Sequence, residues 1–374
     1  MKIFTVIPKK YAGCGFYRQY QPHRHLMAQG AIDVVLSDGT FDEDGNLADS
    51  VKDADIVHIH KGYYSPVSVY KCQQLGIPVI IDFDDWWFVD TEHLFYQDHL
   101  KRTTDMMVKA LKIADYVTVA TERLAVEARK YNKNVVVLPN AFDPSYKSCA
   151  NNRIKEDKVI FGYLGGHCHT KDVGQLRGVN NRFSQEFNNY MFRLMGVDGS
   201  TIYQGYADIL SDNGKLKNTH FDWMETADIW NYPQFYNHLD VSLVPLIGNK
   251  FNSLKSELKL IEAGFFKRAV IVDNVHPYKD LIKHKQNAMV VNKYGDWYKH
   301  CKYLLKNPNA ITELGEALYE TVQPFHIDNV NSKRLNFYKD VLKNTNTNGS
   351  DRRGRIPSVD ELEFFRPPVI SQVE

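Results

Sequence analysis

Three carboxylates and two indoles follow directly on an apolar run at residues 79–81, and they are Asp82, Asp84, Asp85, Trp86 and Trp87. At the carboxyl end of a strand in an α/β sheet, a carboxylate is well placed to act as general base on a hydroxyl group, and an indole can form a platform for a substrate. We therefore predict Asp84 or Asp85 as the catalytic base that acts on the hydroxyl group of a substrate, called the acceptor below. Trp86 is predicted to contact the same acceptor. Metal binding and structural capping of the next turn are the alternative uses of these carboxylates.

A pair of glycines, Gly165 and Gly166, follows another apolar run. Residues without a Cβ atom let the backbone come close to a ligand, and the N-terminus of a following helix offers unpaired N–H groups to a diphosphate. His169 and Lys171 come shortly afterwards. This pattern predicts a diphosphate site, with an ordinary tight turn as the alternative.

The first loop of the chain contains Gly13, Gly15 and Arg18. An arginine that projects from such a loop can pair with phosphate in a bidentate way, whereas a surface arginine on the first helix is the alternative. The loop is not a dinucleotide fingerprint, because Arg18 stands where GxGxxG has its third glycine, and the P-loop pattern is absent as well.

His58 and His60 end a further apolar run, and strand alternation puts both imidazoles on one face of the sheet. No third ligand follows at the spacing of a metal site. We predict His60 as an acceptor contact, a structural role for the other histidine, and no metal site.

The strongest signal lies at residues 252–271, where a polar loop leads into a helix with Glu262 near its end. Gly264 is expected to cap this helix and to let the chain turn back into an apolar strand. Lys255, Glu257 and Lys259 lie at the start of the same helical segment.

Apolar runs of strand length alternate with helical patterns along the chain. The runs lie at residues 2–7, 32–36, 55–60, 79–82, 116–120 and 135–138, and then at 159–164, 192–197, 241–245, 269–272 and 288–291. Helical patterns lie at residues 66–75, 99–113, 122–131, 298–305, 311–322 and 329–342. Alternation of this kind predicts mainly parallel sheets with both faces covered.

The fold class that follows is α/β, with two doubly wound Rossmann-like domains facing a cleft. A polar segment at residues 145–157 has no apolar periodicity and is interpreted as a linker. We predict an N-terminal Rossmann-like domain at residues 1–150 and a C-terminal Rossmann-like domain at 151–325, then a closing helix at 326–343 and a flexible tail at 344–374.

The segment around Glu262 resembles the GT-B glycosyltransferases of the retaining, group 1 type. In that superfamily a glutamate followed closely by a small residue, a glycine and an apolar strand accepts hydrogen bonds from the ribose of a nucleotide sugar. The family often has a second glutamate eight residues earlier, where this chain has Leu254. The candidates to replace it at the donor sugar are Lys255, Ser256 and Glu257.

The resemblance also implies roles for the two glycine loops. Gly165 and Gly166 would lie at the diphosphate, with His169 and Lys171 directed toward it. The loop with Gly13 and Gly15 would lie between the nucleotide sugar and the acceptor. Lys259 and Arg18 are further candidates to stabilise the leaving phosphate.

The resemblance implies a hexosyltransferase or pentosyltransferase that uses a UDP- or GDP-sugar as co-substrate, without a cofactor or an essential metal. The expected acceptor is a glycan or a lipid-linked glycan. Retention, with the leaving phosphate taking the acceptor proton, and inversion, with Asp84 or Asp85 as base, both stay open.

Two alternatives to this function are considered. Phage DNA glucosyltransferases that act on hydroxymethylated bases share the GT-B fold, the Gly-Gly loop, an Asp after an N-domain strand and a polar Asn-rich loop, here at residues 249–252. Such an enzyme would have to flip a base out of the duplex. An inactive sugar-nucleotide or glycan-binding protein on the same scaffold is the other alternative.

The amino-acid composition argues against several classes of protein. Because 46 Lys and Arg balance 45 Asp and Glu, with a formal charge of +1, no general attraction to nucleic acid or to an anionic membrane is expected. The five cysteines are scattered without CxxC spacing, which argues against disulfides and against zinc. No run approaches the roughly 20 apolar residues of a membrane span, so we expect a cytoplasmic protein without integral membrane contact, peripheral membrane association being the alternative.

Overall fold

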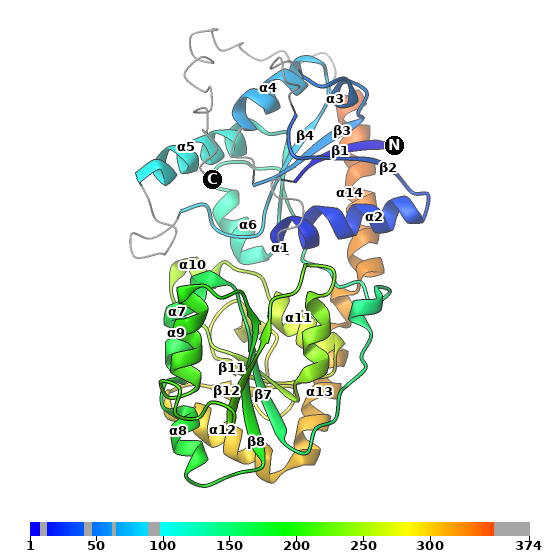
Figure 1. Ribbon diagram of the computed structural model, residues 1–374. Coiled ribbons are helices and arrows are strands. Elements are labelled where there is room, and N and C mark those ends of the chain that lie inside the picture. The colour runs from blue at the N-terminus through cyan, green and yellow to red at the C-terminus, as the bar shows by residue number, and fades with distance from the viewer. Residues whose placement is uncertain (8–12, 41–46, 62–64, 89–97, 348–374) are drawn as a thin grey trace. The chain divides into compact units, whose positions relative to one another are not determined.

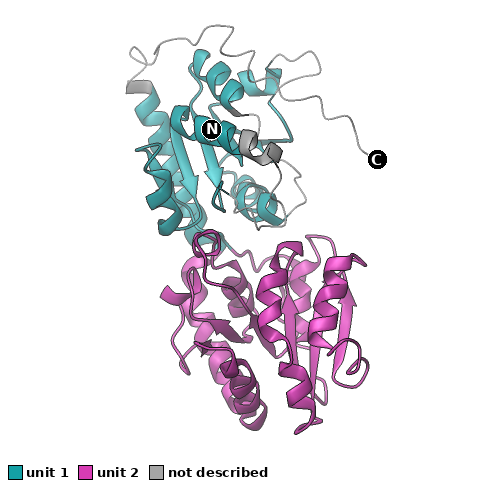
Figure 2. Ribbon diagram, turned by 90° about the vertical axis from the view of Figure 1, so that its left-hand side faces the viewer, with its two compact units in different colours: residues 1–141, 327–374 teal, residues 142–326 magenta. Residues whose placement is uncertain are grey.

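The computed structural model describes residues 1–7, 13–40, 47–61, 65–88 and 98–347, so most of the predicted tail lies outside the described residues. The chain divides into two compact units (Figure 2). Unit 1 comprises Met1–Ala141 and Ile327–Glu374, and unit 2 comprises Phe142–His326. Each unit has one six-stranded parallel sheet with helices around it, which confirms the predicted α/β class with two doubly wound sheets (Figure 1).

The sheet of unit 1 has the strand order β2-β1-β3-β4-β5-β6. Its strands are β1 (Lys2–Val6), β2 (Asp33–Ser37), β3 (Ile56–His60), β4 (Val79–Phe83), β5 (Tyr116–Val119) and β6 (Val135–Val137). The chain passes from β1 to β2 on one side and then returns to β3 on the other. The topological switch point, where doubly wound sheets bind ligands, therefore lies between β1 and β3.

Gly13, Gly15 and Arg18, which were predicted to lie in a loop, are helical instead. The described helices of unit 1 follow one another in chain order. They are α1 (Gly13–Gly15), a π-helix at Phe16–Tyr20, α2 (Gln21–Ala28), α3 (Asp49–Lys52), α4 (Ser65–Gln74), α5 (Asp98–Ile113), α6 (Glu122–Ala128) and α14 (Ile327–Thr347). The last helix belongs to the first unit, because Phe337 and Tyr338 of α14 share a core with Ile3, Leu26 and Ile80.

One face of the sheet in unit 1 carries a row of polar side chains. The parallel register pairs Thr5 with His58, His60 with Asp82 and Asp82 with Thr118, so all five residues lie on one face. All five are buried. A buried polar row requires partners, and these determine the candidate site of this unit.

The sheet of unit 2 has the order β12-β11-β10-β7-β8-β9. Its strands are β7 (Val159–Leu164), β8 (Tyr190–Val197), β9 (Phe221–Glu225), β10 (Val241–Val244), β11 (Ala269–Asp273) and β12 (Met289–Val291). The chain builds β8 and β9 on one side of β7 and the remaining strands on the other. The switch point of this sheet lies between β7 and β10.

The helices of unit 2 cover both faces of its sheet. They are α7 (Thr170–Val173), α8 (Val179–Ser184), α9 (Thr201–Leu210), α10 (Lys250–Ser253), α11 (Leu258–Phe265), α12 (Gly295–Lys306) and α13 (Pro308–Val322), with short 3-10 segments at His167–His169 and Tyr232–His238 among others.

The expected capping role of Gly264 is wrong, because this residue lies inside α11. A Cβ atom there would come within 2.6 Å of the side chain of Val322 on α13. The residue with the left-handed backbone after α11 is instead Lys267, with φ +56°. Gly264 thus serves the close packing of α11 on α13, and Lys267 turns the chain toward β11.

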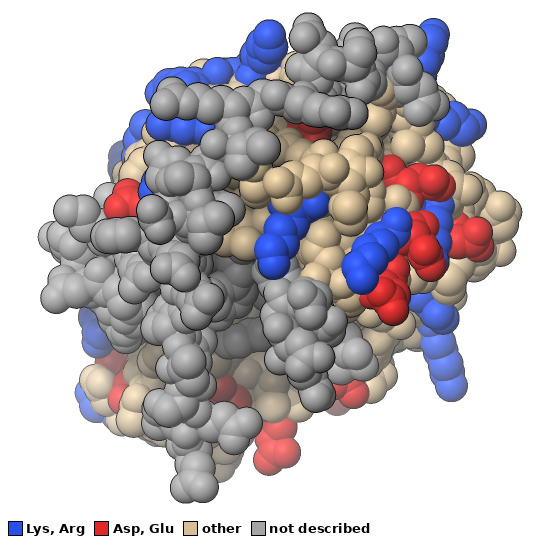
Figure 3. Space-filling model, turned by 90° about the horizontal axis from the view of Figure 1, so that it is seen from above, with Lys and Arg blue, Asp and Glu red and all other residues tan. Residues whose placement is uncertain are grey.

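In the face of the molecule drawn in Figure 3, basic and acidic side chains lie next to one another over the described residues, in line with a formal charge of +1. Among the described residues, no helix is both long enough and apolar enough to cross a membrane.

Candidate functional site

The loop after β7 is held in place by two tyrosines of α9. Tyr203 donates its hydroxyl hydrogen bond to the carbonyl of Gly165, at 2.9 Å, and Tyr206 donates to the carbonyl of Gly166, at 3.0 Å. The backbone N–H of His169 donates to the hydroxyl of Tyr206, at 3.0 Å. The two predicted glycines therefore stand in a fixed loop at the switch point of the sheet in unit 2.

A side chain at position 165 would not fit. A Cβ atom on Gly165 would lie 2.2 Å from the hydroxyl oxygen of Tyr163 and 3.1 Å from Nζ of Lys259. The ammonium of Lys259 also lies 5.1 Å from the ring centre of Tyr163. The glycine is thus required because a phenol and an ammonium group occupy the space beside its backbone.

Lys259 has the electrostatic character of an anion-binding group. Its pKa is lowered from 10.5 to about 8, by burial first and then by the charge of Lys255. Within the described part of the chain, no carboxylate forms an ion pair with Lys259. A partly buried ammonium beside a second lysine and without a paired carboxylate gains most from a negatively charged ligand.

Asp172 links the loop after β7 with the loop after β10. Its Oδ1 accepts the backbone N–H of Ile247, at 2.7 Å, and the amide of Asn252, at 3.4 Å, while Oδ2 lies 2.7 Å from Nδ1 of His169. The carboxylate therefore fixes the loop geometry on both sides of the switch point.

The predicted role of His169 as a cation at the diphosphate needs correction. Burial, together with the charges of Lys259 and Lys255, lowers the pKa of His169 to about 4. Its imidazole is therefore neutral at pH 7 and is bound to Asp172. Lys171, the other predicted basic residue of this loop, is exposed on α7.

Glu262 is buried in the middle of α11, with 1% of its surface exposed. Its Oε2 accepts a hydrogen bond from the hydroxyl of Tyr236, at 3.0 Å, and another from Tyr232, at 3.3 Å. The charge of Glu262 also acts on Lys259, one helical turn earlier. The structure thus brings together Glu262, Lys259 and Gly165 of the predicted donor residues.

The other two predicted donor residues precede α11. Glu257 is the residue directly before the helix, and burial raises its pKa to about 7. The ammonium of Lys255 lies 5.2 Å from the ring centre of Phe251. Both lie between α10, which contains Asn252, and α11, in the connection that follows the carboxyl end of β10.

In unit 1, Arg18 lies in a buried ion pair, which contradicts its predicted contact with phosphate. Its guanidinium is fully buried and donates to both oxygens of Asp82, at 3.1 Å and 2.6 Å. It also donates to the carbonyl of Leu138 and to the side chain of Asn140. Burial alone would raise the pKa of Asp82, but Arg18 and His60 together outweigh burial, so the pKa is lowered and the carboxylate stays ionised.

Asp82 also orients the predicted acceptor residue His60. Nδ1 of His60 lies 2.7 Å from Oδ2 of Asp82, and Nε2 lies 3.9 Å from Oδ1 of Asp84. His58 has the structural role expected of one of the two histidines, since its Nδ1 lies 2.8 Å from the hydroxyl of Tyr338 on α14.

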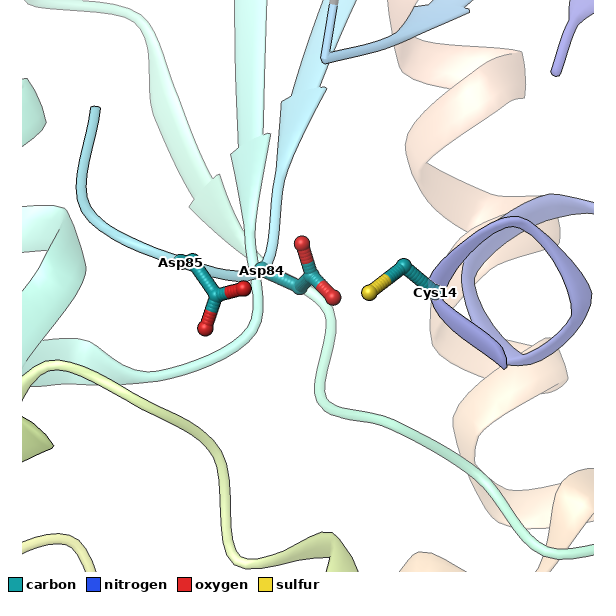
Figure 4. Close-up of side chains that lie close together, drawn as sticks. All are labelled: Cys14, Asp84 and Asp85. Atoms are coloured by element: carbon teal, nitrogen blue, oxygen red, sulfur yellow. The ribbon is translucent and has the colours of Figure 1, made fainter. Parts of the chain in front are cut away.

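The two predicted catalytic carboxylates form one cluster with a thiol. Asp84, Asp85 and Cys14 each direct one ligand atom to a common space, within 4.8 Å of one another (Figure 4). Nζ of Lys61 lies 2.8 Å from Asp84, 3.1 Å from Asp85 and 3.5 Å from the sulfur of Cys14. The ammonium of Lys61 therefore takes the place that a cation would have among these groups.

Lys61 also changes the expected basicity of Asp84. Burial would raise the pKa of Asp84, but the charge and hydrogen bond of Lys61, together with His60 and Cys14, outweigh burial and lower it. A carboxylate with a lowered pKa is a weak proton acceptor. It remains a good hydrogen-bond acceptor for a hydroxyl group.

The remaining predicted residues of unit 1 are neighbours in sequence of Cys14 or of Asp85. Gly13 and Gly15 form the short helix α1 together with Cys14. The ring of Trp86 is partly buried, with its centre 5.4 Å from that of Phe88.

Several residues of these sites were missed by sequence reasoning, namely Tyr163, Asp172, Tyr232, Tyr236, His167, Asp198 and Lys61. Nε2 of His167, directly after Gly166, lies 2.6 Å from Asp198 at the end of β8. The only signal available for His167 and Lys61 was their position at the carboxyl end of a strand. Tyr232, Tyr236 and Asp198 are distant in sequence from the residues that they contact.

Solved structures resemble this chain over nine tenths of its length. A glycosyltransferase from Rickettsia africae ESF-5 shares 16% identity and a TM-score of 0.63, covering 92% of this chain and 99% of its own. Sucrose-phosphate synthase from Thermosynechococcus elongatus has a TM-score of 0.67 and 16% identity, and the match covers 92% of this chain and 99% of that one. Anabaena HepE, solved in complex with UDP-glucose, has a TM-score of 0.65 and 13% identity, and the match covers 91% of this chain and 100% of that one.

These similarities, with the two parallel six-stranded sheets, define the protein as one with the GT-B fold of glycosyltransferases. No protein-family model matches the chain, and no curated protein matches it in sequence.

Proposed function

We propose that the protein is a glycosyltransferase, which moves a hexose or a pentose from a nucleoside-diphosphate sugar to a hydroxyl acceptor. Unit 2 would bind the donor, and unit 1 would bind the acceptor. The nucleotide would be uridine or guanosine diphosphate, with uridine favoured because HepE was solved with UDP-glucose. No cofactor or essential metal is part of the proposal.

One observation carries the donor site: the ammonium of Lys259 lies beside the backbone of Gly165, at the switch point of a doubly wound sheet. The site thus combines a lysine that has no paired carboxylate among the described residues with a loop that has no side chain in the way. A diphosphate would satisfy Lys259, and the departing phosphate would be stabilised by the same charge. Glu262, three residues later on α11, would accept the ribose hydroxyls.

In unit 1 we propose that Asp84 and Asp85 accept hydrogen bonds from acceptor hydroxyls, with His60 and Trp86 as further acceptor contacts. The lowered pKa of Asp84 favours a reaction in which the leaving phosphate, rather than this carboxylate, takes the proton. The proposed acceptor is a glycan or a lipid-linked glycan.

The test of the donor site is binding and turnover of nucleotide sugars. We expect UDP to raise the melting temperature of the protein, because a ligand that binds only the folded state stabilises it. We also expect slow release of UDP from UDP-glucose, which Glu262→Ala abolishes. Lys299→Met, at a position with 64% of the side chain exposed, is the control and should behave as the wild type.

If no nucleotide changes the melting temperature of the protein, the assignment of the donor site is refuted. Equal release of UDP by Glu262→Ala and the wild type would refute the role of Glu262. Binding of UDP without any release over hours would favour the inactive scaffold, and glycosylation of hydroxymethylated DNA would favour the phage-type alternative. Both alternatives stay predictions.

A further inference from the structure

Two tyrosine hydroxyls share one oxygen of the carboxylate of Glu262. Tyr236 donates to Oε2 at 3.0 Å and Tyr232 donates to the same atom at 3.3 Å. The two tyrosines lie four residues apart on the short helical segment Tyr232–His238. A carboxylate oxygen has about two lone-pair sites for hydrogen bonds, so these phenols use the accepting capacity of Oε2.

The two tyrosines differ in how firmly they are held. Tyr236 has 1% of its surface exposed, its ring stacks on Phe266 with centres 5.4 Å apart, and its carbonyl accepts a hydrogen bond from Arg268. Tyr232 is only partly buried, and its hydrogen bond to Oε2 is the longer one. If one phenol leaves Oε2, it is Tyr232.

A ribose has two neighbouring hydroxyl groups, and together they bind a carboxylate best when each donates to a different oxygen. On Glu262 this arrangement requires a donor position on Oε2, which both phenols already occupy. The ligand must therefore displace one of them.

We propose that the hydroxyl of Tyr232 occupies the position on Glu262 that a ribose hydroxyl of the donor takes, and that Tyr236 stays bound. This inference rests on the proposed function and extends it. Tyr232 is then a positioning residue that keeps the buried carboxylate hydrogen-bonded until the nucleotide arrives. It lowers nucleotide affinity, because its hydrogen bond must be broken first.

The two tyrosines give a matched pair of variants with opposite expected effects. Tyr232→Phe removes the competing hydroxyl, so the affinity for UDP should rise by about three- to tenfold, the size of one net hydrogen bond. Tyr236→Phe removes the hydroxyl that stays with Glu262, so the affinity should fall. Thermal unfolding of each variant shows whether it is folded.

The experiment is isothermal titration calorimetry with two probes, UDP and 2′,3′-dideoxyuridine diphosphate. The dideoxy compound has no ribose hydroxyls to compete with Tyr232, so Tyr232→Phe should leave its affinity unchanged. Tyr232→Leu is a second variant without the hydroxyl, and it should also bind UDP more tightly than the wild type does.

Weaker or unchanged binding of UDP by both Tyr232 variants would overturn the inference, as would an equal gain for UDP and the dideoxy compound. In either case, UDP binding by the wild type and its loss in Glu262→Ala would leave the proposed function standing. If the wild type binds no nucleotide, the proposed function fails, and the inference fails with it.

Discussion

Replacement of Lys259 by methionine should stabilise the fold while it weakens the proposed donor site. The folded protein holds the pKa of Lys259 at about 8, against an ordinary value of 10.5, and this difference corresponds to about 3 kcal/mol at pH 7. Because the side chain is only partly buried, solvent reduces this cost, and we expect Lys259→Met to gain about 1 to 2 kcal/mol. Methionine keeps the length of the chain and removes the charge.

The pH dependence of the free energy of unfolding tests independently whether the charge of Lys259 destabilises the folded protein. Below pH 8 both folded and unfolded chains carry the proton on Lys259, and the full cost of the buried charge is present. Between pH 8 and 10.5 the unfolded chain binds more protons than the folded one, so this group makes the wild type more stable as the pH rises. In Lys259→Met this contribution is absent. The difference in the free energy of unfolding between the variant and the wild type should therefore shrink as the pH rises from 8 to 10.5.

Urea denaturation at pH 7 and at pH 10 measures the effect, with Lys299→Met as the control for loss of a surface charge. In parallel, calorimetry with UDP should show weaker binding by Lys259→Met at pH 7. For the wild type the affinity should fall by up to tenfold per pH unit above pH 8, because an amine must be protonated to pair with the diphosphate. A variant less stable than the wild type at pH 7, or one with unchanged UDP affinity, would refute this account of Lys259.

Three further substitutions test the geometry. Gly165→Ala would place a Cβ atom 2.2 Å from the hydroxyl of Tyr163, so it should cost about 1 to 3 kcal/mol of stability in urea, and part of this cost should disappear in a Tyr163→Phe background. Arg18→Met leaves the buried Asp82 without its guanidinium, so it should cost about 3 to 5 kcal/mol; a surface-like effect below 1 kcal/mol would contradict the buried ion pair. Because the ammonium of Lys61 lies among the carboxylates, Mn²⁺ should leave the melting temperature of the wild type unchanged and raise that of Lys61→Met; a rise in both proteins would show that the lysine does not exclude the ion.

The fold could be predicted from the sequence where each strand is buried on both faces. Strands such as β7 and β11 are continuous apolar runs, and the sequence marks their ends with glycine or aspartate. The strand β9 was missed, because it lies at the edge of its sheet and only Phe221 of its five residues is buried. An edge strand exposed on one side carries polar residues that break the apolar run.

The candidate site could be predicted only where local sequence determines it. The glycine loop after β7 and the glutamate on α11 are local patterns, whereas the partners of a side chain are set by the tertiary fold. The contact between Arg18 and Asp82 spans 64 residues, and nothing near Arg18 in the sequence distinguishes a buried ion pair from a phosphate contact. The neutral state of His169 likewise depends on burial and on the charges of Lys259 in α11 and of Lys255, both distant from it in sequence.

The division of the chain also has a consequence for its synthesis. Unit 2 is one uninterrupted segment, so it can fold on the ribosome as soon as residue 326 has emerged. Unit 1 is begun first but completed last, because the core around Ile3 and Ile80 needs Phe337 and Tyr338 from the final helix. The apolar strands of unit 1 must therefore stay free of aggregation until unit 2 and then α14 have been translated.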